Sequence, residues 1–152
     1  MIKAERVSTL AINHGRIKML QQVSIYAENK KGVYRDITGL LSKNEINILG
    51  SVTNDSAEYG MVRMVVSDSD KAIKVLSDAG YMCKTTPVLG IETEDKVGAL
   101  NNLLDALYDA NINVDYIYLS FNRESGKPIM VLHTDGIYQV ENILTNKGFT
   151  SV

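Results

Sequence analysis

The sequence lacks several features that would point to a particular chemistry. Its 152 residues contain one cysteine, Cys83, two histidines and no tryptophan. A single cysteine excludes an intrachain disulfide and a metal site built from cysteines. The histidines, His14 and His133, are far apart in the sequence and do not have the spacing of metal ligands. We therefore expect no disulfide, no metal site and no cofactor.

An excess of charge of either sign is also missing. The chain has 16 Lys and Arg against 18 Asp and Glu, for a net charge of -2 and a pI near 5.7. The basic residues are scattered and form no run, so no basic patch is predicted. Tyr26, Tyr116 and Tyr118 are not interleaved with basic residues as in RNA-recognition sheets. We expect no nucleic-acid partner.

Long hydrophobic runs are absent. No apolar stretch approaches the roughly 20 residues that a membrane helix needs, so we expect no membrane partner. The composition, 45% hydrophobic and 22% charged, is typical of a globular chain. With its single cysteine, the sequence fits a cytoplasmic protein of one mid-sized domain or two small ones.

What the sequence does contain is an internal repeat. The stretch "ENKKGVYRDITGLLSKNEINIL" at 28–49 recurs as "EDKVGALNNLLDALYDANINV" at 94–114. Equivalent positions lie 66 residues apart: Gly32 and Gly98, Ile37 and Leu103, Leu41 and Leu107, Ile46 and Ile112, and Asn47 and Asn113. Later pairs, such as Gly80 and Gly148, lie 68 apart, which places the extra two residues in a turn. A repeat of this length predicts two copies of one structural unit.

Hydrophobic periodicity predicts the same element order in both copies. In the first copy we expect strand 21–27, a helix from 33 to about 44, strand 46–53, a turn at 54–60, strand 61–67, a helix that ends at Gly80, and strand 81–89. In the second we expect strand 88–93, helix 98–110, strand 112–121, a turn at 122–128, strand 129–134, helix 136–146 and strand 149–152.

Each copy thus follows the order βαββαβ. Right-handed crossovers place both helices on one face of an antiparallel sheet of four strands. The predicted fold class is α+β, with two tandem ferredoxin-like units. We expect an N-terminal extension at 1–19, a first domain at 20–87 and a second at 88–152. Residues 1–18 are either an extension ahead of a natural start at Met19 or a short arm that packs on the body.

The residues around the repeated glycine resemble a known family. The stretches "SIYAENKKGVYRDITGLL", "TNDSAEYGMVRMVVSD" and "NVDYIYLSF" are similar to small stand-alone proteins made of two tandem ACT domains, over residues 20–152. The resemblance implies a non-catalytic regulatory or sensor protein that binds an amino acid near the loop between the first strand and first helix. Many relatives have proline before the loop glycine, where this chain has Lys31 and Val97.

The residues themselves support that location. Gly32 and Gly98 lie where a strand turns into a helix N-terminus, whose unpaired amides attract a carboxylate. Hydroxyl groups of the neighbouring second strand can meet the other polar groups of a ligand. The expected ligand-binding residues are Asn29, Lys31, Gly32, Val33, Ser51, Thr53, Asp95, Lys96, Val97, Gly98, Ala99, Leu100, Tyr118 and Ser120.

Other interpretations stay open. The glycines can serve only the turn, and Asn29 and Asp95 can be simple capping residues. The chain can be an assembly module without a ligand. A ferredoxin-like enzyme of the acylphosphatase type would need an arginine in the loop after the first strand, where this chain has "ENKKG" and "EDKVG". We expect no catalytic residues, and a homodimer that uses strand edges and the aromatic face around Tyr116 and Tyr118.

Overall fold

The computed structural model describes residues 19–54 and 59–152. The expectations for the N-terminal stretch 1–18, and for the part of the first hairpin turn at 55–58, lie outside the described residues. The chain divides into two compact units, with residues 21–86 in the first and residues 87–152, together with Met19 and Leu20, in the second.

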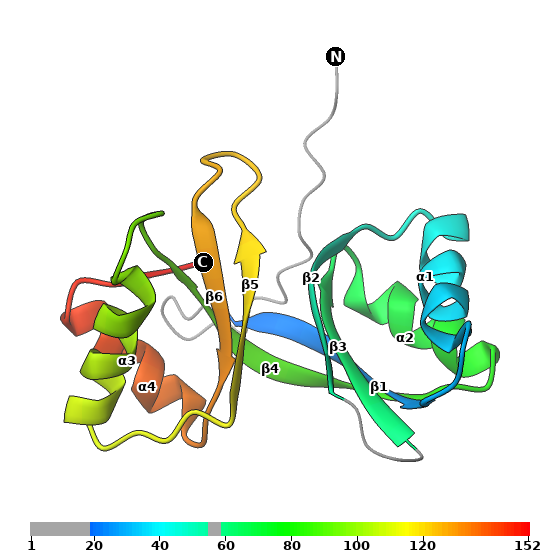
Figure 1. Cartoon of the computed structure of the whole chain (residues 1–152), viewed down its shortest axis with the longest axis horizontal. Helices are drawn as coiled ribbons and strands as arrows, with labels where there is room; N and C mark the ends of the chain where they lie inside the picture. Colours follow the sequence, from blue (N-terminus) through cyan, green and yellow to red (C-terminus); the bar gives the residue numbers. More distant parts are fainter. Residues whose placement is uncertain (1–18, 55–58) are drawn as a thin grey trace. The chain divides into compact units, whose positions relative to one another are not determined.

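The first unit contains β1 (Leu20–Glu28), α1 (Val33–Lys43), β2 (Ile48–Asn54), β3 (Tyr59–Val66) and α2 (Ser69–Asp78). Strand β3 lies between β1 and β2 and is antiparallel to both. Strand β1 also pairs with β4 (Met82–Glu92). Helices α1 and α2 cover one face of these strands (Figure 1). The core between the helices and the sheet consists mainly of Val23, Ile25, Ile37, Leu41, Val62, Met64, Ala72 and Leu76.

The second unit contains the remainder of β4, α3 (Ala99–Asp109), β5 (Tyr116–Phe121), β6 (Pro128–His133), α4 (Ile137–Asn146) and β7 (Thr150–Ser151). Its strands follow the order β5-β6-β4-β7, and all three pairings are antiparallel. Helices α3 and α4 lie on one face (Figure 1). Their core consists of Leu89, Ile91, Leu103, Ala106, Leu107, Leu132, Ile137, Val140 and Leu144. The predicted ferredoxin-like element order is confirmed.

The two strands predicted at 81–89 and 88–93 are in fact one strand. Strand β4 runs without interruption for 11 residues and carries Pro87 inside it. No glycine or asparagine lies between Gly80 and Gly90 to support a turn, and the fixed φ of proline is compatible with extended backbone. The boundary between the two units, at 86/87, therefore lies within a strand.

The second strand of each unit begins later than predicted. We expected starts at Ile46 and Ile112, but β2 begins at Ile48 and β5 at Tyr116. The amides of Ile46 and Ile112 donate to the carbonyls of Leu41 and Leu107, each 3.0 Å away. These bonds close the preceding helix. The first apolar residue after each helix is therefore part of a helix cap and not of a strand.

None of the helices in residues 19–54 and 59–152 is long and apolar enough to cross a membrane.

Candidate functional site

The loops between the first strand and first helix have the same backbone hydrogen bonds in both units. In the first loop, three amides donate to carbonyls: Lys30 to Glu28, Val33 to Lys30, and Asp36 to Gly32. The same bonds recur 66 residues later: Lys96 to Glu94, Ala99 to Lys96, and Asn102 to Gly98. The repeat that is visible in the sequence is thus a repeat of local backbone geometry.

The repeated glycine has a conformational role. Gly32 has φ +95° and Gly98 has φ +87°, in the left-handed region that glycine adopts without steric cost. Both are helix N-caps, and neither helix start has a side-chain cap. A Cβ atom on either glycine would meet no atom within 4 Å. The backbone conformation, rather than a close approach of another protein group, therefore requires glycine here.

The second loop borders a cavity of about 510 Å³. The cavity lies between the start of α3 and the strands β5 and β6, within the second unit. We name it the α3–β5 groove. It is lined by Glu94, Asp95, Lys96, Gly98, Ala99, Leu100, Asn101, Leu104, Leu119, Phe121, Pro128 and Met130.

The wall of the α3–β5 groove is apolar and open to solvent. Leu100 and Leu104 of α3 are 39% and 36% exposed, and Leu119 and Phe121 of β5 are 46% and 45% exposed. Large apolar side chains gathered around a cavity are typical of ligand sites and interfaces. The charged lining residues belong to the loop, so the groove has a polar end and an apolar end.

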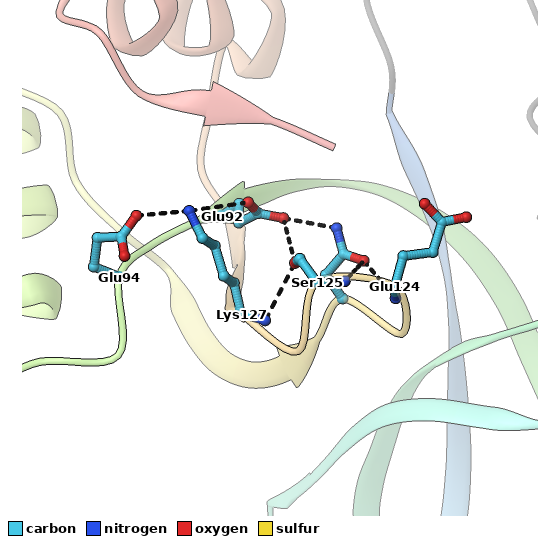
Figure 2. Close-up of polar contacts among 6 residues, drawn as sticks. Glu92, Glu94, Glu124, Ser125 and Lys127 are labelled. Carbon is cyan, nitrogen blue, oxygen red and sulfur yellow. Dashed lines mark hydrogen bonds and ion pairs between the residues drawn. The ribbon is translucent and has the colours of Figure 1, made fainter.

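A polar network beside the groove ties the loop to the β5–β6 turn (Figure 2). Lys127 Nζ donates to Glu94 Oε1 at 2.7 Å and lies 4.0 Å from Glu92 Oε1. The other oxygen of Glu92, Oε2, accepts from Asn122 Nδ2 at 2.7 Å and from Ser125 Oγ at 3.4 Å. The Asn122 side chain also accepts from the amide of Ser125 at 3.2 Å, which folds the turn.

The ion pair in this network shifts the ionisation of both partners. The hydrogen bond from Lys127, and then its charge, hold the pKa of Glu94 below its usual value. The same two interactions with Glu94 raise the pKa of Lys127. Both side chains are exposed to solvent, so water and salt weaken the pair. The pair positions the start of the loop without occupying the apolar wall.

The equivalent position in the first unit is different. Tyr34 replaces Leu100, and its hydroxyl lies 3.1 Å from Ser51 Oγ, so that it bridges α1 and β2. Thr38 and Thr53 stand where the second unit has Leu104 and Leu119. The first unit thus has a side chain across this position and threonine in place of two of the leucines of the second unit.

The structure brings only some of the predicted site residues together. Five of them line the α3–β5 groove: Asp95, Lys96, Gly98, Ala99 and Leu100. Val97 is fully exposed beside it and is not part of the lining. Tyr118 and Ser120 are 7% and 5% exposed. They alternate along β5 with Leu119 and Phe121, and therefore point to the opposite face of the strand.

The predicted residues of the first unit are more dispersed. Val33 packs against the core, and Ser51 contacts Tyr34. Asn29, Lys31 and Thr53 are exposed. No sequence argument had selected the apolar lining residues Leu104, Leu119, Phe121 and Met130. The sequence could have indicated Leu104, because it lies one helical turn after Leu100 on the helix that follows the charged loop. The strand residues lie far from that loop in the sequence.

Other reactive side chains have ordinary partners. His133 Nδ1 lies 2.8 Å from Asp115 Oδ2, and the ring of Tyr116 stacks on the imidazole with centroids 5.2 Å apart. Cys83 is half-buried, with its Sγ 3.4 Å from Ser77 Oγ. Within residues 19–54 and 59–152, no group of three or more His, Cys, Asp or Glu side chains is placed to hold a metal ion.

The chain is similar to known proteins over nearly all of its length. A family model described as an ACT domain pair matches residues 18–151. A protein from Bacteroides thetaiotaomicron has 29% identity and a TM-score of 0.81, over 88% of this chain and 92% of that chain. The ligand-free regulatory subunit of aspartate kinase from Thermus thermophilus has 10% identity and a TM-score of 0.60, over 84% and 91%. The same subunit from Thermus flavus has 13% identity and a TM-score of 0.56, over 84% and 92%. No curated protein matches the chain.

Proposed function

This chain belongs to the ACT domain pair family, and we propose that it is a non-catalytic regulatory protein that binds an amino acid in the second unit. The α3–β5 groove is the observation that carries the proposal, because it joins the repeated loop to a cavity of ligand size. Two proteins of similar fold are regulatory subunits of an enzyme, which is consistent with a regulatory role.

The charges at the groove suit a zwitterion. Lys96 and Asp95 are adjacent on the loop and line the same cavity. An ammonium group and a carboxylate of one ligand can each find the opposite charge there. Glu94 also lines the cavity, and its ion pair with Lys127 partly offsets its negative charge. The first turn of α3, which has no side-chain cap, adds a favourable environment for the carboxylate.

A thermal-shift screen of the twenty amino acids tests the proposal. A ligand that binds only the folded state at 100 times its Kd stabilises that state by about 2.7 kcal/mol. At least one amino acid should raise the melting temperature. Leu100→Tyr, which copies the first unit, should remove the shift because the larger side chain fills the groove. Tyr138→Gln on α4, 51% exposed and outside the groove, is the control and should keep it.

If no amino acid stabilises the protein, the proposal is wrong and an assembly module without a ligand is the better description. A shift that persists in Leu100→Tyr would place the ligand elsewhere on the chain.

We also propose a homodimer. Tyr108 of helix α3 is 83% exposed and lies outside the α3–β5 groove, and an exposed aromatic side chain is typical of an interface. Tyr118, the residue first expected at the interface, is only 7% exposed. Light scattering at micromolar concentration should give twice the chain mass of 16.8 kDa. Tyr108→Lys should weaken association, whereas a monomeric parent protein would contradict the proposal.

A further inference from the structure

The α3–β5 groove also indicates the class of ligand. Resting on the proposed function, we propose that the groove selects an amino acid with a large apolar side chain. Three residues of the apolar wall, Leu104, Leu119 and Phe121, determine this specificity.

The charged and the apolar lining residues are segregated, and the polar Asn101 on α3 donates to Asp105 Oδ2 at 2.9 Å. The charged side chains, those of Glu94, Asp95 and Lys96, all belong to the loop before α3. The residues contributed by β5 and β6 are all apolar: Leu119, Phe121, Pro128 and Met130. A ligand whose charged groups meet the loop must therefore direct its side chain along the apolar wall.

The physical chemistry of that wall discriminates between side chains. Each methylene group transferred from water to an apolar wall strengthens binding about fourfold. A hydroxyl or charged group that packs against the wall loses part of its hydration and finds no polar side chain on Leu119, Phe121, Pro128 or Met130. Leucine, methionine and phenylalanine are the expected ligands. Alanine lacks the apolar surface, and threonine, aspartate and lysine bring polar groups to the wall.

The first unit provides an internal comparison. Its equivalents of Leu104 and Leu119 are Thr38 and Thr53. Its Tyr34 contacts Ser51 across the position at which Leu100 leaves the α3–β5 groove open. The two units share the loop geometry but not the wall. The apolar wall is thus a feature of the second unit that neither the turn nor the fold requires.

Calorimetric titration of the full chain with individual amino acids tests the inference. Leucine, methionine or phenylalanine should bind at least about tenfold more tightly than alanine, and threonine no more tightly than alanine. Tighter binding of a small or charged amino acid would overturn the inference but leave the proposed function standing. If none of the twenty binds, the proposed function fails and the inference fails with it.

Two substitutions test the wall itself. Leu119→Thr introduces the residue of the first unit and keeps a strand-compatible side chain. Leu104→Gln places a polar side chain at the other side of the wall and keeps a residue type that favours a helix. Each should lower the ratio of leucine to alanine affinity about tenfold, because apolar contact is lost only for the larger ligand. Tyr138→Gln should leave the ratio unchanged. If all three variants fold with unaltered melting curves and keep the parent's ratio of leucine to alanine affinity, the wall does not determine specificity.

Discussion

The glycines of this chain show how backbone conformation, rather than contact with other residues, constrains a position. Gly98 has φ +87°, whereas Gly39 lies in the interior of α1. A Cβ atom would meet nothing within 4 Å at either position. Only the backbone conformation separates them, so the same substitution has opposite effects on stability.

We predict that Gly98→Ala destabilises the protein by about 1–2 kcal/mol, the cost of a left-handed conformation for an L-residue. Gly39→Ala should stabilise it by about 0.5–1 kcal/mol, because alanine loses less backbone entropy in a helix. Urea denaturation of both variants gives the two free energies of unfolding. A neutral Gly98→Ala would mean that the loop relaxes to negative φ. A loss of ligand binding in Gly98→Ala would reflect both the added Cβ atom and the altered loop backbone.

At the scale of elements, the second helix of the first unit and the second helix of the second unit begin with different caps. Helix α2 has Asp68 as N-cap, whose Oδ1 accepts from the amide of Lys71 at 3.0 Å. Helix α4 has Gly136, with φ +63° and no side-chain cap. Asp68→Ala should lower the free energy of unfolding by about 1 kcal/mol, and Asp68→Asn should restore most of it. Equal stability of the Ala and Asn variants in urea would show that the cap contributes nothing.

The loop and the β5–β6 turn form a second element-scale contact, and it depends on pH. Lys127 lowers the pKa of Glu94 in the folded state, so the pair stabilises the fold above the usual pKa of a glutamate. That contribution is lost as the pH falls through the lowered pKa. NMR titration of the Glu94 carboxyl should show a higher midpoint in Lys127→Met than in the parent. Lys147→Met, an exposed change outside this network, is the control.

High salt should narrow the difference between Lys127→Met and the parent, since the pair is exposed. An identical Glu94 midpoint in the two proteins would show that the ion pair does not persist in solution.

At the scale of the whole molecule, each unit has a core of its own. Leu41 and Leu107 occupy equivalent positions of the repeat and are 0% and 1% exposed. Leu41→Ala and Leu107→Ala should each cost about 2–5 kcal/mol through lost burial and a cavity. Hydrogen exchange should accelerate first in the unit that carries the substitution. Uniform acceleration over both units would show that they unfold as one.

A second whole-molecule prediction concerns residues 1–18. Every helix and strand that the structure describes lies within residues 20–151. A chain that begins at Met19 should therefore keep the circular dichroism spectrum and melting temperature of the parent. A large loss of soluble expression would make the N-terminal stretch part of a core.

Local patterns were sufficient to predict much of this protein. The period of 3.6 located α1 and α3 to within a residue or two, and the offset of 66 predicted two units of one fold. These features depend on side chains close in the sequence, whose periodicity survives in any tertiary context. The repeated glycine was equally visible, because a left-handed helix start requires that residue type.

Only the tertiary structure decided which residues meet. Leu104 of α3 and Leu119 of β5 line one groove, although 15 positions separate them in the sequence. The face of β5 that carries Leu119 and Phe121, rather than Tyr118 and Ser120, turns toward that groove because β5 pairs with β6 in one register. The alternation of side chains along the strand predicted two faces, but it did not show which face borders the groove. The sequence likewise showed Tyr34 in place of Leu100, but only the fold placed the Tyr34 hydroxyl 3.1 Å from Ser51 Oγ, because that contact joins two elements.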